Sequence, residues 1–242
     1  MLSEAVNKTW AQLLHPTFRK VFIIGVLASL VTLVALNYTA YAFWPEGMIT
    51  GIDWVDGYLH DWGVGDWAII AMAGPAMIIV SYFLFPPIAT AVMGLMNDDI
   101  VDAVEDEYYP HNKATRKAKV VEAFLGALKL ALTIIFMNLL ALIPYLILLF
   151  LSGGIGTLLL YLVMNGYLIG REYMEMVAIR HMPAREIKNF RKRHHSKFMT
   201  GGVLIVAMFL VPFLNIAAPI IGASIMTHIV QKALAEDKFG PR

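Results

Sequence analysis

Two apolar runs meet at a helix-breaking pentapeptide within residues 201–228, which read GGVLIVAMFL-VPFLN-IAAPIIGASIMTH. The first run, Gly201 to Val211, is only about 11 residues long. At 1.5 Å per residue it would reach roughly 17 Å as a helix, against a hydrocarbon core of roughly 30 Å. Because one such arm cannot cross a membrane, we expect residues 201–230 to form a re-entrant hairpin that enters and leaves by one face.

The composition is typical of a polytopic membrane protein. Of the 242 residues, 59% are hydrophobic and 15% are charged, and the mean hydropathy is +0.66. The chain has no cysteine, which excludes a disulfide framework, a cysteine metal site and a thiol nucleophile. We therefore predict an all-α integral membrane protein that forms one domain over residues 1–242.

The predicted membrane arrangement has two long transmembrane helices, two re-entrant, partly inserted helical hairpins and interfacial amphipathic helices. In one hairpin, arms of about Phe124 to Ile143 and Thr157 to Ile169 meet across Pro144 to Gly156, where Ser152-Gly153-Gly154 breaks the helix. The second arm has only about 13 residues, too few to cross. In chain order, the predicted segments are an interfacial helix (1–15), a transmembrane helix (18–43), an external loop (44–66), a transmembrane helix (67–97) with an acidic extension to 110, a hairpin (121–170), a basic surface helix (182–197) and the re-entrant hairpin (201–230).

Basic residues give the predicted orientation. They lie near the N-terminus, at Lys113 to Lys119 and at Arg171 to Lys197, and cytoplasmic loops are enriched in lysine and arginine. All three segments can be cytoplasmic only if each hairpin returns to its starting side. The acidic run from Asp98 to Glu107 is interpreted as a solvated helix face that pairs with the basic residues after it.

The start of the first transmembrane helix is a candidate anion site. Pro16 suits the first turn of a helix, where the amides of Thr17 and Phe18 are unpaired at the positive helix end beside Arg19 and Lys20. Such an end favours a negative charge. An Arg-Lys pair beside a first spanning helix is equally a plain topology signal, so two interpretations remain open.

Polar and small residues at membrane depth give further hypotheses. Asn138 and Asn165 can each hydrogen-bond a neighbouring helix, or they can line a pathway together with Asn215. Gly166 and Gly170 form a G-x-x-x-G pair that would let another helix approach closely. The membrane segments offer no convincing nucleophile with a base and no metal-binding cluster, so we expect no enzyme activity, no metal and no cofactor.

The order of these features resembles the CysZ family of bacterial sulfate permeases, within the wider etoposide-induced-protein-like superfamily. In that family the helix start after the proline typically carries a glycine, an aliphatic residue and one or two arginines. Here Arg19 matches, Lys20 matches in charge, and Thr17 stands where glycine is usual. The likeness is carried by Leu14 to Leu36, Pro86 to Asp102, Arg171-Glu172-Tyr173, Met182-Pro183 with the basic residues to Lys197, Val211 to Asn215, Pro219 and Ala223 to His228.

The resemblance implies a homo-oligomer in the bacterial inner membrane that imports sulfate, or a related oxyanion, for cysteine biosynthesis. It also implies that the anion is bound by Thr17, Phe18, Arg19 and Lys20. The expected partners are the oxyanion and the lipid bilayer, and not nucleic acid, because few aromatic residues are interleaved with the basic ones. The alternative is a membrane scaffold without transport activity, which binds anionic lipids through its basic surface helix.

Overall fold

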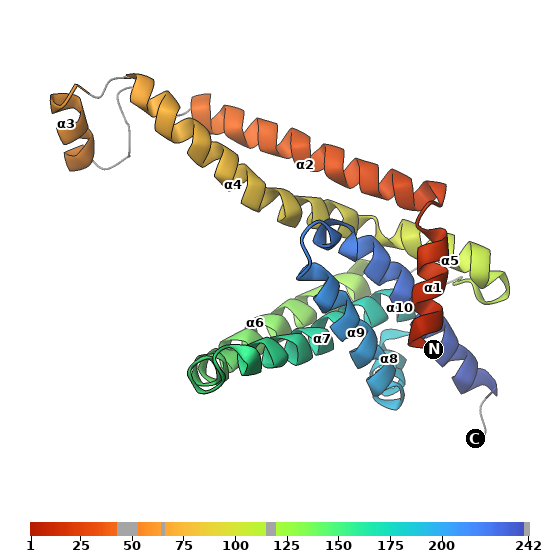
Figure 1. Cartoon of the computed structure of the whole chain (residues 1–242). Helices are drawn as coiled ribbons and strands as arrows, with labels where there is room; N and C mark the ends of the chain where they lie inside the picture. Colours follow the sequence, from red (N-terminus) through yellow and green to blue (C-terminus); the bar gives the residue numbers. More distant parts are fainter. Residues whose placement is uncertain (43–52, 64–65, 115–119, 240–242) are drawn as a thin grey trace. The chain divides into compact units, whose positions relative to one another are not determined.

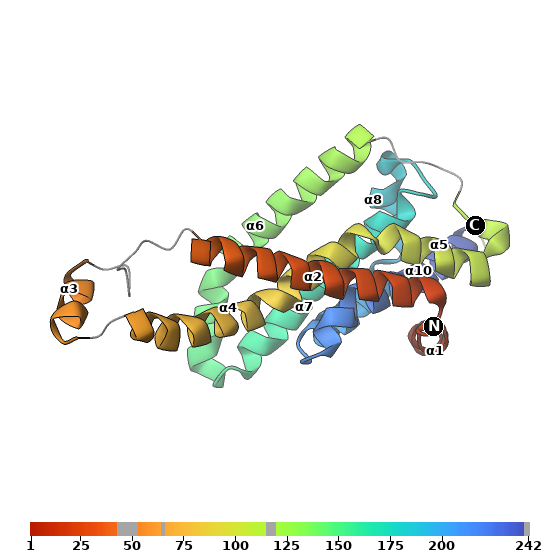
Figure 2. The same cartoon turned by 90° about the horizontal axis from the view of Figure 1, so that it is seen from above.

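The computed structural model describes residues 1–42, 53–63, 66–114 and 120–239, and no strand occurs in those ranges (Figure 1, and Figure 2 from above). This confirms the predicted all-α class. The elements are α1 (Leu2–Gln12), α2 (Pro16–Ala42), α3 (Asp53–Asp61), α4 (Asp66–Leu95), α5 (Asn97–Tyr108), the 3-10 turn η1 (Pro110–Asn112), α6 (Val120–Ser152), α7 (Ile155–Ala178), α8 (Ala184–Arg193), α9 (His195–Phe209) and α10 (Leu214–Phe239).

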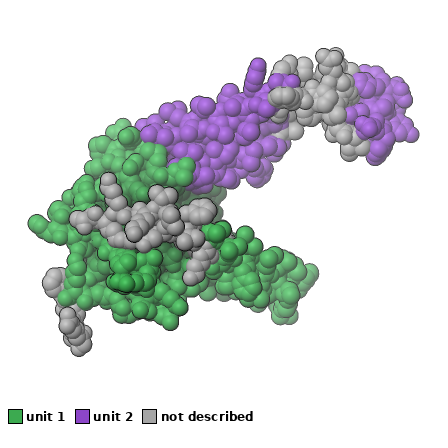
Figure 3. All heavy atoms as spheres, turned by 180° about the vertical axis from the view of Figure 1, so that it is seen from behind, with its two compact units in different colours: residues 1–21, 94–242 green, residues 22–93 purple. Residues whose placement is uncertain are grey.

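The chain divides into two compact units, which Figure 3 draws in different colours. Unit 1 comprises Met1–Val21 and Gly94–Arg242, and unit 2 comprises Phe22–Met93. Within unit 2, side chains join α2 to α4: the Asn37 amide donates to the Ser81 hydroxyl over 2.8 Å. Many large apolar side chains of both helices are exposed, including Leu27, Leu30, Val31, Val34, Ile78, Ile79, Tyr82 and Phe83.

Helix α10 is the central element of unit 1. Residues 218–231 are all buried, and α1, α5, α7 and α9 pack against this helix. Helix α1 is far from α10 in the sequence but contacts it directly. The Thr9 and Ser224 hydroxyls are hydrogen-bonded at 2.9 Å, and Lys232 pairs with Glu4 at 2.9 Å. The first and last helices of the chain are therefore held together by direct contacts.

Helices α7 and α9 approach each other at glycines. A Cβ atom on Gly166 would lie 2.4 Å from the Val203 side chain, and one on Gly170 would lie 2.3 Å from the carbonyl oxygen of Phe198. Real Cβ atoms do not come this close, so only glycine allows the observed contact. The structure confirms the prediction that Gly166 and Gly170 let another helix approach.

The turn between α9 and α10 follows the predicted break. Helix α9 ends at Phe209, α10 begins at Leu214, and Phe213 between them has a φ of 64°, a left-handed value that is rare outside glycine. Across the far end of the hairpin, Lys197 pairs with Glu236, and His194 Nε2 contacts Asp237 Oδ1 at 2.8 Å. The start of α9 and the end of α10 consequently lie side by side.

The other hairpin differs from its prediction. Helix α6 continues through Pro144 to Ser152, and the turn is formed by Gly153 and Gly154, whose φ angles are 57° and 95°. Helix α7 then runs to Ala178 rather than ending near Ile169. The predicted helix break at Ser152-Gly153-Gly154 is confirmed. The predicted end of the first arm at Ile143 is wrong, because neighbouring helices and local adjustment let Pro144 remain within an apolar helix. The short second arm is wrong because Arg171 and Glu175 pair one turn apart and continue α7 beyond its apolar run.

Two further boundaries also differ. The predicted basic surface helix, 182–197, is shorter, because α8 ends at Arg193 and the next helix starts at His195. The predicted external loop, 44–66, contains the helix α3. Residues 43–52 and 64–65 of that loop lie outside the described residues, as do three expected basic partners of the acidic run, Arg116, Lys117 and Lys119.

Four helices of the described ranges are long and apolar enough to cross a membrane, where the sequence predicted two spanning helices. The spans of α2, α4 and α6 expose most of their apolar residues, which is not typical of soluble monomers and marks a surface covered by lipid or protein, whereas the α10 span is 78% buried within the protein. The four segments are Pro16–Thr39, Met77–Leu95, Ile135–Ser152 and Leu214–Lys238.

Candidate functional site

The first turn of α2 is capped by the residue before it. The Thr17 amide donates to His15 Nδ1 over 3.2 Å, and the Arg19 amide donates to the His15 carbonyl over 3.1 Å. Pro16 has no N–H, so the Phe18 amide is the remaining free donor of this turn within the described residues. The capped Thr17 amide is therefore less available to an anion than the sequence suggested.

The four predicted anion-binding residues do not converge on one point. Thr17 and Lys20 are three positions apart on the helix and line the same cleft. The Phe18 side chain is only 2% exposed and packs in the core of unit 1. Arg19 is exposed and does not line the cleft. Neither Arg19 nor Lys20 forms an ion pair with any residue that the structure describes.

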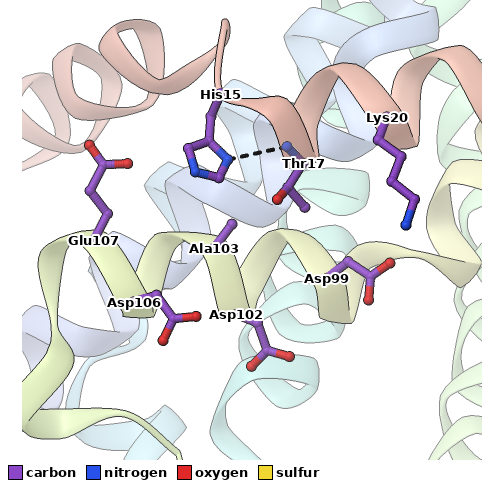
Figure 4. A pocket seen from close by; sticks show the side chains of 8 residues that line it. All are labelled: His15, Thr17, Lys20, Asp99, Asp102, Ala103, Asp106 and Glu107. Carbon is purple, nitrogen blue, oxygen red and sulfur yellow. Dashed lines mark hydrogen bonds between the residues drawn. The ribbon is translucent and has the colours of Figure 1, made fainter.

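The cleft encloses about 690 Å³ between the start of α2 and the helix α5. Figure 4 shows His15, Thr17 and Lys20 on one side and the α5 side chains on the other. Four of its lining residues are acidic, so carboxylates outnumber the single lysine. The α5 residues that line it are Asp99, Asp102, Ala103, Asp106 and Glu107.

Most of these carboxylates have partners. Asp102 pairs with Arg180, which also contacts Asp98 at 3.5 Å, and Asp106 pairs with Lys113 at 2.6 Å. The Glu107 carboxylate accepts a hydrogen bond from Gln12 Nε2 over 2.6 Å. Asp99 has no such partner in the described chain and lines the cleft with Lys20. An anion that binds Lys20 would therefore have to compete with Asp99.

The acidic helix also contains a buried carboxylate that the sequence interpretation missed. Glu105 is fully buried, and its carboxylate accepts from His181 Nε2 at 2.7 Å, Gln231 Nε2 at 2.9 Å and the Ala114 amide at 3.1 Å. Burial raises the pKa of Glu105, but the hydrogen bonds from His181 and Ala114, together with the charge of Arg180, outweigh it and hold the pKa below 4.5. This residue joins α5 to the end of α7 and to α10.

A signal for this burial is present in the sequence. Ile100, Val101 and Val104 recur at helical spacing, and Glu105 lies one turn after Val101 on the same face. The structure buries all three apolar residues. The interpretation of the whole run as solvated was wrong for Glu105. The predicted pairing with the following basic residues is confirmed for Lys113 and Asp106.

The three candidate pathway asparagines lie on three different helices. Asn138 is exposed on α6, Asn165 lies on α7, and Asn215 lies at the start of α10. The Asn165 amide donates to the carbonyl of Tyr161 in its own helix over 3.0 Å. The Asn165 side chain is also hydrogen-bonded to Tyr145 of α6, as the sequence interpretation expected for a polar group facing a neighbouring helix.

The helices, their exposed apolar faces and the uncharged hairpin turns define an integral membrane protein of the all-α class. The chain belongs to the family described as Sulfate transporter CysZ/Etoposide-induced protein 2.4, whose model matches residues 5–219. The match includes both the start of α2 and the helix α5. Searches of curated proteins and of solved structures found no match. The family is of the transporter type, and it agrees with the resemblance noted from the sequence motifs.

Proposed function

We propose that the protein is an oxyanion permease that carries sulfate across the bacterial inner membrane for cysteine biosynthesis, as a homo-oligomer. The observation that carries the proposal is the exposure of Arg19 and Lys20, without ion-pair partners among the described residues, at the positive end of a long apolar helix. Membership in a sulfate-transporter family supports the same class of substrate. Together with Thr17 and Phe18, these two cations form the proposed first contact of the anion.

The start of α2 suits an anion that must be released again. The Phe18 amide, the helix dipole and the two cations favour a divalent anion. The carboxylates of α5 oppose it, and Asp99 competes for Lys20. A transport site needs binding strong enough to admit the ion and weak enough to let it leave. The acidic wall would therefore keep the affinity low at the point of entry.

The hairpin turns support the proposed arrangement of two spanning helices and two re-entrant hairpins. No charged residue occurs from residue 130 to residue 170, or from residue 198 to residue 231. At the two turns, Phe150 is 84% exposed and Phe213 is 83% exposed. A turn that crossed into water would expose these aromatic rings to it. A turn that stays in the hydrocarbon region would not, and α9, at roughly 22 Å, is too short to cross.

A membrane scaffold that binds anionic lipids is the second candidate function. The observation in its favour is α8, whose Arg185 side chain is 85% exposed and whose Lys188 and Lys192 are also exposed. Within the same helix, however, Arg191 pairs with Glu175 and Arg193 pairs with Asp237. Fewer cations are consequently free for a lipid surface than the count of basic residues suggests.

The deciding experiment is uptake of radiolabelled sulfate into liposomes that contain the purified protein. We expect saturable uptake in the natural chain and its loss in Arg19→Glu and Lys20→Glu, because both reversals place a carboxylate where the anion enters. Arg185→Glu is the matched control, since it reverses an exposed arginine far along the sequence from α2. Uptake unchanged in Arg19→Glu and Lys20→Glu at normal abundance would refute the proposed site. No uptake by a folded, inserted natural chain would favour the scaffold.

A further inference from the structure

A second, basic cleft lies between α7, α8 and α9, apart from the cleft at α2. Helix α7 contributes Tyr167 and Arg171, α8 contributes Arg191, and α9 contributes His195 with Phe198 and Met199. Tyr167, Arg171 and Glu175 recur at four-residue spacing, so they form one stripe along α7. The glycine contacts between α7 and α9 place this stripe directly against the first turns of α9.

Two guanidinium groups in this cleft share one carboxylate oxygen. Glu175 Oε1 accepts from Arg171 Nε at 2.8 Å and from Arg191 Nη1 at 2.6 Å. The Arg171 side chain is 8% exposed and that of Arg191 is 17% exposed. A further hydrogen bond from Arg171 Nη1 reaches the Thr133 hydroxyl, over a long 3.4 Å. One positive charge is thus left without a carboxylate in a largely buried setting, at least among the described residues.

A buried charge is costly unless a counter-charge and hydrogen bonds satisfy it. The donors that remain are the outer N–H groups of two arginines, and His195 lies at the mouth of the cleft with its ring 5.9 Å from that of Tyr167. Arginine presents its N–H groups as a planar fork that matches the oxygens of sulfate and phosphate groups. The cleft therefore offers the donors and the charge that a tetrahedral oxyanion requires.

We propose that Arg171, Arg191 and His195 bind a tetrahedral oxyanion, either free sulfate or phosphate or the phosphate of a lipid headgroup. The space inside the cleft is about 10 Å³, room for about one water molecule. The anion accordingly places one or two oxygens between the arginines, and the rest of it lies outside the cleft. A free anion and a lipid headgroup can both bind in this way. This site is separate from Thr17 to Lys20 and does not depend on the transport proposal.

The test uses the full chain in detergent and measures two binding reactions. One arm is equilibrium binding of radiolabelled sulfate and of radiolabelled phosphate. The other is retention of phosphatidylglycerol, followed by native mass spectrometry as the lipid is titrated. The first variant is Arg191→Gln. The second is His195→Gln, which tests the site even if Arg191→Gln fails to fold, because the His195 side chain is exposed and its replacement should not disturb folding. Arg185→Gln is the matched control, because it removes the same charge from the same helix at an exposed position.

We expect Arg191→Gln to weaken binding about tenfold or more in at least one arm, since one charge-assisted hydrogen bond is lost. His195→Gln should weaken it less, and Arg185→Gln should match the natural chain. Loss in the sulfate and phosphate arm identifies a free anion, and loss in the lipid arm identifies a headgroup. Equal binding by Arg191→Gln, His195→Gln and the natural chain in both arms would overturn the proposal. Neither arm includes transport, so its result is independent of the uptake experiment.

Discussion

A Cβ atom placed on Gly202 would lie 2.0 Å from the carbonyl oxygen of Gly166, so the two helices α9 and α7 meet backbone to backbone. The same atom would lie 2.5 Å from the Gly170 amide nitrogen. Close backbone contact of this kind lets small residues hold helices together where water supplies no hydrophobic driving force. It also fixes the separation between Arg171, which follows Gly170, and the first turns of α9.

Gly202→Ala should destabilise the protein by about 1–3 kcal/mol, because the added methyl group meets backbone atoms that cannot rotate away. The measurement is thermal unfolding in detergent, followed by circular dichroism. Gly94→Ala is the matched control, since its Cβ would meet nothing within 4 Å and alanine favours a helix by up to about 1 kcal/mol. Equal melting temperatures for the two variants would contradict the proposed contact.

Glu105 should make the stability of the protein depend on acid pH. Its pKa is lowered in the folded state, so its stabilisation is fully present above the ordinary value of 4.5 and is lost as the pH falls below that value toward the folded pKa. Glu105→Gln should cost about 1–3 kcal/mol at neutral pH and flatten this acid limb. Melting temperatures between neutral pH and pH of about 3 test both effects, with the exposed Glu186→Gln as control. If Glu105→Gln loses stability at acid pH as steeply as the natural chain, other groups must cause that loss.

Neutralising the two cations of α2 should have unequal effects on sulfate uptake. Lys20 lines the cleft and Arg19 does not, so Lys20→Gln should raise the KM for sulfate by up to about tenfold and Arg19→Gln by less. Initial uptake rates over a range of sulfate concentrations measure the difference. A larger effect of Arg19→Gln would move the anion contact to the face of α2 opposite the cleft.

The two hairpin turns can be located with single cysteines, because the natural chain contains none. Phe150→Cys and Phe213→Cys should resist a membrane-impermeant maleimide from both sides of the membrane, since each turn is proposed to lie in the hydrocarbon region. Arg185→Cys should react from the cytoplasmic side alone. Labelling of either turn from the external side would mean that its hairpin crosses the membrane.

Alanine substitution tests whether the asparagines line a pathway. If Asn138, Asn165 and Asn215 contact the moving anion, the triple alanine variant should lower the maximal uptake rate. Its free energy of unfolding should fall by no more than about 1 kcal/mol for each hydrogen bond that is lost. The three single alanine variants show which of the three helices contributes to the uptake rate. A normal uptake rate in the triple variant would leave these residues with a packing role.

The sequence predicted the helices and their breaks more successfully than it predicted their partners. The Val211–Asn215 break and the Gly166–Gly170 contact depend on local chemistry, a proline in one case and the absence of a Cβ in the other, and both were confirmed. The break at Ser152-Gly153-Gly154 was also confirmed, but the helix before it was predicted to end at Ile143, because the sequence gives no sign that a membrane helix will retain Pro144. Glu105 was missed because its partners, His181 and Gln231, are separated from it by 76 and 126 residues.

In the candidate site too, the sequence predicted local features but not contacts between distant residues. Periodicity could place Thr17 and Lys20 on one face of a helix, and the structure has both residues lining one cleft. It could not reveal that the opposite wall is α5, because no local pattern links residues about 80 positions apart in the chain. The shared use of Glu175 by Arg171 and Arg191 depends on the packing of three helices and has no signature in the sequence around either arginine.

The contact between α1 and α10 has a consequence for biosynthesis. Thr9 and Ser224 are 215 positions apart, so the ribosome makes α1 well before α10, and the contact between the two helices forms only after Ser224 has been synthesised. Until then α1 has no docking site on α10, and an amphipathic helix in that position can lie on the lipid surface. Synthesis of α10 would then allow α1 to dock against it.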